Sequence, residues 1–520
     1  MKFSIKIPFF FLVLVTGLNG LYSQPINVKI SSVSGKNEPS ICINPNNPNE
    51  VVVGTNLKSV YRSSDGGKTW TSGKMNSTFG VWGDPVIACD TAGYFYFFHL
   101  SNPPFGSWID RMVCQKSKDA GKTWSDGSHV GKNGLKAQDK EWVSIDPQTN
   151  IIYMTWTQFD KYGSRDDTLY SNILFSKSED AGITWETPLQ INAISGDCID
   201  SSLTNEGAVP AVGPNGEVYV SWAGPAGLVF DKSLDGGETW MKKDILVDSF
   251  KTGWTYDIPG ISRCNGMPIT VCDLSVGENN GTIYVNWSDQ RNGKDDTDVW
   301  LRKSEDGGNT WSKPKRVNDD TTKTQQFLTW MTIDQSTGFL YFIWYDRRNY
   351  EDTKTDVYMA VSYDGGETFV NGILSEKPFD PSKGVFFGDY TNISAVKGNV
   401  RPIWTAMNND KTEIWTALYT EQNTKVAVVE NYNWAVDSYP NPFQSEVNIV
   451  FTLSNPQKIK IGLYDLNGSR IGWIRKKKKL KAGEQKITFQ ASEFDLVPGT
   501  YLYLLECEDF VIRKKLVFAP

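Results

Sequence analysis

One eight-residue pattern recurs six times along this chain of 520 residues: Ser-x-Asp-x-Gly-x-Thr followed by an aromatic residue. Such recurrence indicates a repeat protein, in which one supersecondary unit is copied along the chain. We interpret each copy as a hairpin turn in which Asp accepts backbone N–H bonds, Gly takes a positive φ and the aromatic ring packs under the turn. A structural role, rather than metal binding or acid catalysis, is therefore predicted for the six aspartates: Asp65, Asp119, Asp180, Asp235, Asp306 and Asp364.

Short strands rich in Val, Tyr and Trp precede each copy, and they predict an all-β propeller built from four-stranded blades. Seven turns between first and second strands, against six copies of the pattern, favour seven blades, six of them bearing the pattern; six blades are the alternative. The last unit, from Asp389 to about Thr420, lacks the pattern. We expect residues 26–33 to supply its outer strand, because closing the ring removes the open sheet edges. The propeller is predicted over residues 25–420.

The two ends of the chain differ in character from the repeats. Lys2 and Lys6 precede an apolar run over residues 7–15, which predicts a signal peptide over residues 1–24 rather than a membrane span. A polar linker over residues 421–436 leads to alternating segments over residues 437–520, which predict a small β-sandwich.

Two motifs of this C-terminal domain, Tyr-Pro-Asn-Pro-Phe at 439–443 and Val-Pro-Gly-Thr-Tyr at 497–501, resemble the C-terminal sorting domain of the type IX secretion system of Bacteroidetes. The resemblance implies handling by that secretion machinery. It also implies a protein that is secreted or held at the outer-membrane cell surface, with no transmembrane segment in the mature chain.

Charge and cysteine content narrow the classes of partner. A net charge of −7 argues against nucleic-acid binding. The seven cysteines form no Cys-x-x-Cys motif, so neither zinc nor a disulfide framework is supported; the best candidate for a single bridge is Cys198 with Cys264. The basic run at 475–479 is interpreted as an exposed hairpin tip rather than a binding patch.

The six copies resemble the Asp-box, or BNR repeat, of the sialidase-like β-propellers, and the resemblance covers roughly residues 38–420. Two segments match that family in position, Asn205-Glu206-Gly207 and Gly388-Asp389-Tyr390-Thr391. The resemblance implies that Tyr390 is a nucleophile and Glu206 the base that takes its proton, because a Tyr with a pKa near 10 needs such help. It also implies Asp84, in Trp82-Gly83-Asp84-Pro85, and Asp389 as substrate contacts. An ordinary turn role is the alternative for these carboxylates.

Strand alternation places the site on the face opposite the Asp-boxes, which we call the boxless face. Two long loops there, residues 289–298 and 346–356, share Asp-x-Arg-Asn and a later Thr-Asp-Val. Arg291, Arg347 and Asp346 are predicted substrate contacts, since a guanidinium makes two parallel hydrogen bonds to one anionic group of a glycan. The alternatives are an Arg–Asp pair that holds each loop shut and, more weakly, structural calcium. No other cofactor and no metal site is predicted.

Departures from the family weigh against a true sialidase. Where the family offers the first arginine of the triad that binds sialic acid, this chain has Asn37-Glu38-Pro39-Ser40, with the charge reversed. The leading prediction is therefore a glycan-processing protein, a glycoside hydrolase for acidic carbohydrate, with an extracellular polysaccharide or glycoconjugate as its partner. The alternatives are a non-catalytic surface propeller that binds carbohydrate or protein, and a polysaccharide lyase with Tyr390 or His99 as its base.

Overall fold

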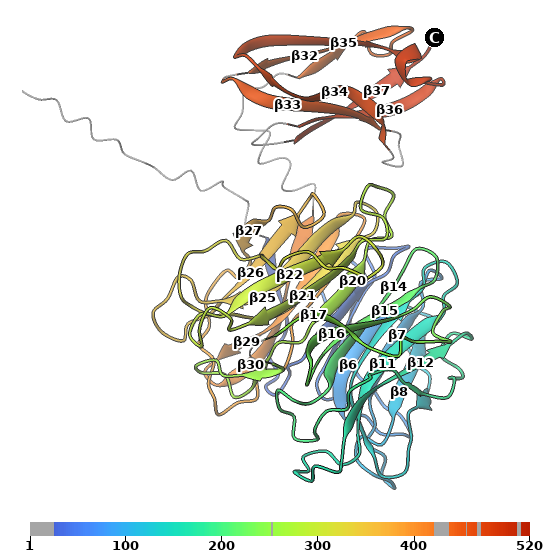
Figure 1. The fold of residues 1–520 in the computed structure, drawn as a ribbon, viewed down its shortest axis with the longest axis vertical. Coiled ribbons are helices and arrows are strands. Elements are labelled where there is room, and N and C mark those ends of the chain that lie inside the picture. The colour runs from blue at the N-terminus through green and yellow to red at the C-terminus, as the bar shows by residue number, and fades with distance from the viewer. Residues whose placement is uncertain (1–24, 251–252, 421–435, 454, 465–469, 507–510) are drawn as a thin grey trace, which may run out of the picture.

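The computed structural model describes residues 25–250, 253–420, 436–453, 455–464, 470–506 and 511–520. The predicted signal peptide, nearly all of the predicted linker and Cys507 lie outside the described residues. The described chain forms two β units, residues 26–420, blue to orange in Figure 1, and residues 437–518, in red. A search of the described residues finds no helix long and apolar enough to cross a membrane.

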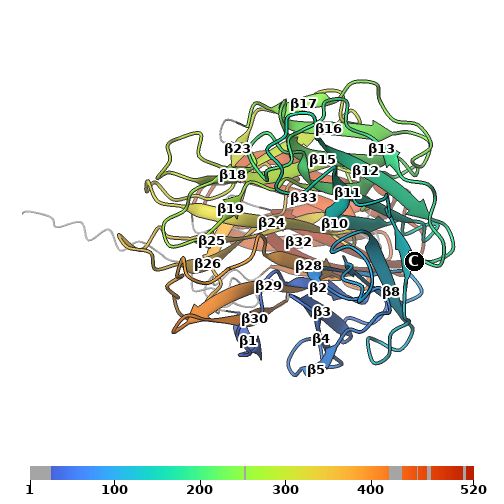
Figure 2. The same cartoon turned by 90° about the horizontal axis from the view of Figure 1, so that it is seen from below.

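Seven antiparallel sheets of four strands make up the first unit, in agreement with the predicted seven-bladed propeller. Their inner strands lie side by side around a central axis, and β28 meets β2 to complete the ring. Figure 2 shows inner strands near the centre and outer strands such as β5 and β17 at the rim. The inner strands are β2 (Ser40–Ile43), β6 (Gly83–Cys89), β10 (Ala137–Ile145), β14 (Glu206–Val212), β20 (Ile269–Cys272), β24 (Gln326–Asp334) and β28 (Asn392–Val396).

Each blade continues outward through three more strands. The second strands are β3 (Val51–Thr55), β7 (Phe95–Leu100), β11 (Ile152–Phe159), β15 (Val218–Gly224), β21 (Ile283–Asp289), β25 (Phe339–Asp346) and β29 (Asn399–Asn408). The third strands are β4 (Ser59–Ser63), β8 (Met112–Ser117), β12 (Ser171–Ser178), β16 (Gly227–Ser233), β22 (Asp298–Ser304), β26 (Asp356–Ser362) and β30 (Lys411–Thr420). The outer strands are β5 (Thr71–Lys74), β9 (Ser128–Val130), β13 (Leu189–Gln190), β17 (Ile245–Asp248), β23 (Lys315–Arg316), β27 (Val370–Ile373) and β1 (Ile26–Ser31). A two-stranded ribbon, β18 (Thr255–Tyr256) with β19 (Cys264–Asn265), lies in the loop between the fourth and fifth blades.

The second strands are covered on both faces by neighbouring blades, which explains their composition. Strand β7 reads FYFFHL and is buried throughout, and β25 reads FLYFIWYD with all but its first residue buried. Aromatic and β-branched residues suit such strands, because a strand buried on both faces needs large side chains in every position. Five second strands each bury one Trp completely: Trp156, Trp222, Trp287, Trp344 and Trp404.

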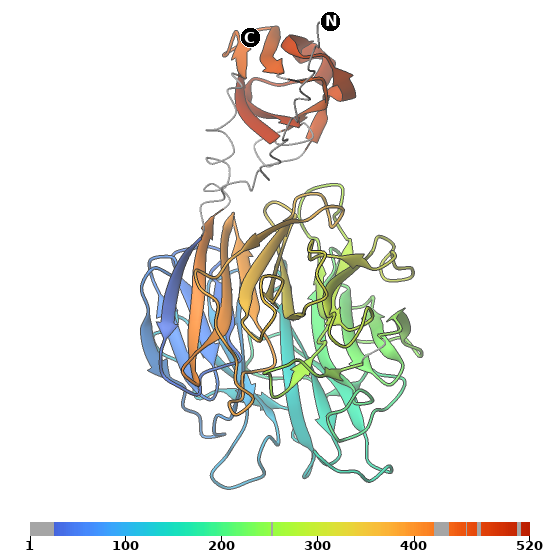
Figure 3. The same ribbon diagram turned by 90° about the vertical axis from the view of Figure 1, so that its left-hand side faces the viewer.

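The N-terminal strand β1 closes the ring by pairing with β30 of the seventh blade, which confirms the predicted closure. In Figure 3 the blue N-terminal strands lie beside the orange strands of that blade. A second link comes from Arg401 of β29, whose buried guanidinium donates hydrogen bonds to the carbonyl oxygens of Gly66 (2.6 Å), Val400 and Tyr419. Because Gly66 lies in the first Asp-box, this side chain joins the last blade to the first.

Each Asp-box turn is held by its own side chains. In the first box, the Thr69 N–H donates to Asp65 Oδ1 at 2.9 Å and the Thr69 hydroxyl to Asp65 Oδ2 at 2.7 Å. The Gly67 N–H donates to Ser63 Oγ, and the Trp70 indole donates to the Gly67 carbonyl. The Ser–Asp and Thr–Asp bonds recur in the other five boxes. Desolvation alone would raise the pKa of Asp65, but the hydrogen bonds from Thr69 and Ser63 outweigh it and lower this pKa to about 2.

The second unit is a β-sandwich, as predicted. One sheet holds β31 (Asp437–Tyr439), β32 (Glu446–Leu453) and β35 (Gly483–Gln490), and the other holds β34 (Arg470–Leu480), β33 (Gln457–Tyr464), β36 (Gly499–Glu506) and β37 (Val511–Phe518). A short 3₁₀ turn, η1 (Ala491–Phe494), follows β35. The basic run at 475–479 lies within the edge strand β34, so its interpretation as a hairpin tip was wrong. Its exposed lysines fit that place, because charged side chains protect a sheet edge from pairing with other chains.

Candidate active site

The inner strands begin on the boxless face, and several of them begin with a β-bulge. The pairing register shifts between Gly83 and Val86 in β6, and at matching places in β10, β14 and β24. The bulged residues Asp84 and Lys140 have positive φ angles of 52° and 53°, and Glu38, just before β2, has a φ of 50°. Bulges of this kind redirect side chains and are common beside active sites. Asp84, Lys140 and Glu38 all contribute to one polar cluster at the axis.

An ion-pair bridge, Lys140–Asp389–Arg263, forms the middle of this cluster. Lys140 Nζ lies 2.7 Å from Asp389 Oδ2, 3.0 Å from Asp84 Oδ2 and 3.7 Å from Glu38 Oε1. Arg263, in the loop before β20, binds Asp389 through Nε at 2.9 Å and through Nη2. Burial alone would raise the pKa of Asp389, but Lys140 and Arg263 outweigh it and lower this pKa. The carboxylate of Asp389 therefore stays ionised between two cations.

A carboxyl pair lies at each end of the bridge. Glu38 is hydrogen-bonded to Asp84, and Glu206 to Asp200. Arg263 Nη1 lies 3.0 Å from Asp200 Oδ2 and so joins the second pair to the bridge. The pKa of each Glu is raised, chiefly by burial and then by its Asp partner. The two Asp side chains reach solvent, with exposed fractions of 14% for Asp84 and 16% for Asp200, whereas both glutamates are buried behind them.

Asp139 lies between the two pairs. Its Oδ1 accepts a hydrogen bond from the Lys140 backbone N–H at 2.9 Å. Burial raises the pKa of Asp139 to about 7; Lys140 lowers it, and Asp84 and Asp200 add to the increase. We call Glu38, Asp84, Asp139, Lys140, Asp200, Glu206, Arg263 and Asp389 the axial cluster. It contains six carboxyl groups and two cations. Burial raises the pKa of Glu38, Asp139 and Glu206, whereas the two cations lower that of Asp389.

Tyr390 lies against an aromatic floor formed by Trp142 and Trp330, with ring centroids 5.1 and 6.1 Å away. Its hydroxyl has no hydrogen-bond partner within the described chain. Burial raises the pKa of Tyr390 well above its ordinary value, and Glu38 and Asp84 raise it further. No hydrogen bond between described residues joins Tyr390 to Glu206, so their assignment as nucleophile and base remains a prediction.

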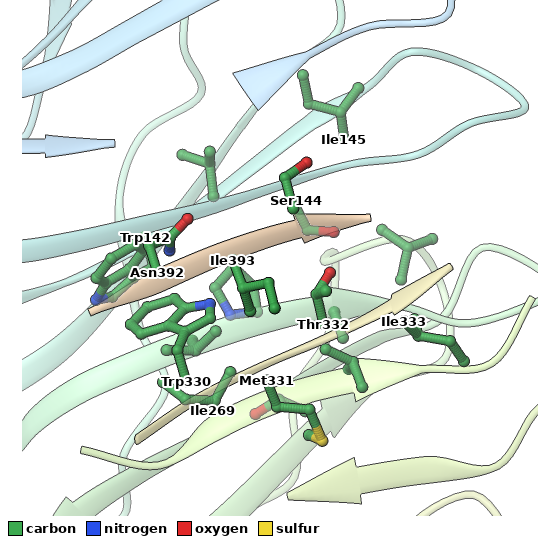
Figure 4. Close-up of a pocket in the computed structure, with 18 of the residues that line it drawn as sticks. Trp142, Ser144, Ile145, Ile269, Trp330, Met331, Thr332, Ile333, Asn392 and Ile393 are labelled. Atoms are coloured by element: carbon green, nitrogen blue, oxygen red, sulfur yellow. The ribbon is translucent and has the colours of Figure 1, made fainter. Parts of the chain in front are cut away.

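The axis of the propeller also contains a cavity of about 370 Å³, lined by residues of all seven inner strands. Figure 4 shows Trp142 and Trp330 at one side of this cavity, with Ser144, Thr332 and Ile393 further along it. The two indole rings lie 4.2 Å apart, centroid to centroid.

The two arginine loops form internal pairs, the alternative that the sequence left open. Arg291 binds Asp289 through Nη2 at 2.6 Å, and Arg348 binds Asp346 through Nη2 at 2.8 Å. Each of these aspartates also accepts a bond from the indole of the Trp two residues before it. Arg347 is buried and donates to Thr355 and Gln325. Arg291, Arg347 and Asp346, the predicted substrate residues, thus contact their own loops, neighbouring strands and the adjacent loop at 325. None of these contacts is with the axial cluster.

Two further expectations from the sequence concern cysteine and histidine. Cys198 and Cys264 are both free thiols, so the bridge proposed between them was wrong. Each is held by strand pairing, Cys198 opposite Ser164 and Cys264 in the β18–β19 ribbon. His99, the alternative lyase base, is buried and bonded to Leu100 O and Gln115 Oε1, and burial lowers its pKa to about 4. Among the described residues no group of three or more His, Cys, Asp or Glu side chains is placed to hold a metal ion.

The structure brings together four residues named from the sequence: Asp84, Glu206 and Asp389 as site residues, and Glu38 only as a reversed charge. It adds Asp139, Lys140, Asp200 and Arg263, which sequence reasoning missed. A signal for two of them was present, because Asp139-Lys140-Glu141 is a charged triplet inside an otherwise strand-like segment. Asp200 and Arg263 lie in long inter-blade loops that carry no recognisable pattern.

Residues 437–519 match the family model of the secretion system C-terminal sorting domain. The prediction for the C-terminal domain is confirmed. A domain of this kind marks the chain as a secreted or cell-surface protein of a Bacteroidetes-type bacterium.

Comparison with the curated proteins gives no match. Among solved structures, an ulvan lyase of polysaccharide lyase family PL25 is 13% identical, with a TM-score of 0.44, over 76% of this chain and 96% of the lyase chain. A protein of unknown function from Dyadobacter fermentans is 12% identical, with a TM-score of 0.45, over 77% of this chain and 98% of its own. The sialidase of Trypanosoma rangeli is 11% identical, with a TM-score of 0.43, over 94% of this chain and 89% of its own.

Proposed function

We propose that this chain is a secreted glycoside hydrolase that works by acid–base chemistry at the axial cluster. The observation that carries the proposal is the arrangement of six carboxyl groups around Lys140 and Arg263, which drives the pKa values of those carboxyl groups apart. Burial raises the pKa of Asp139 to about 7, whereas Lys140 and Arg263 lower that of Asp389. Carboxyl groups whose surroundings drive their pKa values apart are what acid and base catalysis needs at neutral pH.

Asp139 is the general acid in this proposal. A carboxyl group with a pKa of about 7 still carries its proton in much of the population at neutral pH, and can donate it to the oxygen of the leaving sugar as the glycosidic C–O bond breaks. Water adds to the anomeric carbon, and one of the two exposed carboxylates, Asp84 or Asp200, takes the proton from that water. The bond cleaved is thus replaced by one C–OH on each product, and the overall reaction consumes one water.

The Lys140–Asp389–Arg263 bridge holds the reacting groups in place. Lys140 contacts Asp84 and Arg263 contacts Asp200, so the bridge fixes the separation of the two exposed carboxyl groups. Rigid support of this kind matters because small displacements of a catalytic group cost large factors in rate. Buried Glu38 and Glu206 carry protons behind Asp84 and Asp200 and can exchange them with those groups.

The experiment is mass spectrometry of glycans incubated with the purified full-length chain. The panel contains neutral, sialylated, uronate-containing and sulfated oligosaccharides, so it also covers the acidic carbohydrate predicted from the sequence. Products whose summed mass exceeds that of the substrate by one water, and which disappear with Asp139→Asn, support a hydrolase with Asp139 as its acid.

Two other results would overturn the proposal. Products of unchanged summed mass would indicate a lyase. Intact glycans throughout, with a chain that unfolds cooperatively, would indicate a binding module.

A further inference from the structure

We propose that Trp82, Trp108 and Tyr162 form a wall that binds one uncharged sugar ring between Asp84 and Asp200. We call these three residues the aromatic wall. The proposal rests on the proposed function, because it names the class of sugar that the axial cluster receives.

The wall is a continuous set of edge-to-face ring contacts. The Trp82 and Trp108 ring centroids lie 5.6 Å apart at an interplanar angle of 87°, and those of Trp108 and Tyr162 lie 5.9 Å apart at 78°. Trp82 immediately precedes β6, Trp108 lies in the β7–β8 loop and Tyr162 in the β11–β12 loop, all on the boxless face. Trp108 is 43% exposed, so a large part of its indole faces solvent.

One end of the wall contacts one of the two partly exposed carboxyl groups, and the other end lies next to the second along the chain. Trp82 is two residues before Asp84. At the other end the Tyr162 hydroxyl donates to Asp200 Oδ2 at 3.4 Å. The indole of buried Trp254 donates to Asp200 Oδ1 at 2.8 Å and fixes that carboxyl group from the other side. A ring that stacks on the wall therefore has a carboxyl group at either end.

The exposed Trp108 is held by a rigid loop. Ser101 Oγ donates to Asp110 Oδ1 at 2.9 Å, and Arg111 binds both carboxylate oxygens of Asp110 at 2.7 Å. The carbonyl of Ile109 accepts a hydrogen bond from the Gln138 N–H at the start of β10. These buried bonds fix the backbone that follows Trp108, and the ring contacts with Trp82 and Tyr162 hold its indole. The indole is therefore positioned before any ligand arrives, and little entropy is lost when a sugar stacks on it.

The charges of the axial cluster favour an uncharged sugar. Lys140 is bound to Asp389 and Asp84, and Arg263 to Asp389 and Asp200, so both cations are already paired with carboxylates. The three carboxyl groups paired with these cations, Asp84, Asp200 and Asp389, outnumber the two cations, so an anionic sugar would be repelled. A neutral pyranose can place its C–H face on Trp108 and donate its hydroxyl hydrogens to Asp84 and Asp200, because aromatic faces and carboxylates suit these two parts of the sugar.

The test measures binding and hydrolysis separately for a panel of neutral gluco-, xylo-, manno- and galacto-oligosaccharides, with sialylated and uronate-containing ones in parallel. Trp108→Ala is compared with Trp108→Phe and with Phe105→Ala. Phe105 is the matched control, because it lies in the same β7–β8 loop and is 97% exposed but is not part of the wall. Binding is followed by saturation-transfer NMR and calorimetry, and folding by the unfolding midpoint.

We expect the wild type to bind a neutral oligosaccharide, Trp108→Ala to weaken that binding at least tenfold, Trp108→Phe to recover part of it, and Phe105→Ala to leave it unchanged. KM should rise with little change in kcat. Equal binding by Trp108→Ala and the wild type, or binding of acidic glycans alone, would overturn the proposal that the aromatic wall binds a neutral sugar. Binding that depends on Trp108 without any hydrolysis would support the wall and reject only the hydrolase.

Discussion

Lys140 Nζ lies 2.7 Å from Asp389 Oδ2, although 249 positions separate the two residues in the sequence. They belong to the third and seventh blades, and their contact crosses the axis of the propeller. Both side chains are buried, with Lys140 only 6% exposed. Such a pair makes the geometry of the axial cluster depend on the whole ring, because neither blade can move without separating the two charges.

Lys140→Met should therefore destabilise the protein strongly. The substitution keeps the side-chain length but leaves Asp389, Asp84 and Glu38 without their shared cation. Removing one partner of a buried ion pair costs about 3–5 kcal/mol. The measurement is the free energy of unfolding from a denaturant titration.

Lys177→Met is the control for this change. Lys177 is also 6% exposed, but its partners Glu179, Glu186 and Glu238 lie largely in solvent. They stay hydrated when the lysine is lost, so the cost should be about 0–1 kcal/mol. Equal losses for the two variants would contradict a special role for the bridge at the axis.

The stability of the protein should fall as the pH rises from about 4 to about 7. In the folded state the pKa of Asp139 is raised to about 7, whereas an unfolded Asp has a pKa of about 3.9, so the folded state binds more protons between these values. Protonation therefore stabilises the fold below pH 4, and this contribution is lost as the pH rises through 7. Asp139→Asn should make the unfolding midpoint less dependent on pH over this range. An unchanged pH dependence would argue against the raised pKa.

The Asp-boxes should make the stability of the protein fall in acid, which is the opposite of the trend expected from Asp139. Hydrogen bonds from Ser233 and Thr239 lower the pKa of Asp235 to about 2, so its contribution is present above pH 4 and is lost as the pH falls toward 2. Asp235→Ala should lower the unfolding midpoint at pH 7, with a cost of about 1–2 kcal/mol for the lost bonds, and leave hydrolysis per folded molecule unchanged. The exposed Asp257 offers a control, since Asp257→Ala should change neither the unfolding midpoint nor hydrolysis. A drop in activity without a drop in stability would contradict a structural role.

The fold could be predicted from the sequence because its signals are local. In a box such as Ser63 to Trp70, the hydrogen bonds that hold the turn join residues at most four positions apart. Each turn of a blade therefore depends on a few consecutive residues. The axial cluster differs, because it depends on bulges at Asp84 and Lys140 and on contacts between residues far apart in the chain. The sequence located Glu206 and Asp389 by resemblance, but nothing local indicated that Arg263 would reach Asp389.

Tyr390→Phe distinguishes the two chemical routes open to this site. The resemblance to sialidases predicts Tyr390 as the nucleophile, in which case loss of the hydroxyl should reduce kcat by three orders of magnitude or more. In the proposed carboxyl route the hydroxyl takes no part, so kcat should change less than about tenfold. Removal of a buried hydroxyl without a partner should also leave the unfolding midpoint equal or higher, because its desolvation is no longer a cost and the ring contact with Trp142 remains. A folded Tyr390→Phe chain that no longer hydrolyses glycans, while Asp139→Asn still does, would reject the carboxyl route in favour of Tyr390.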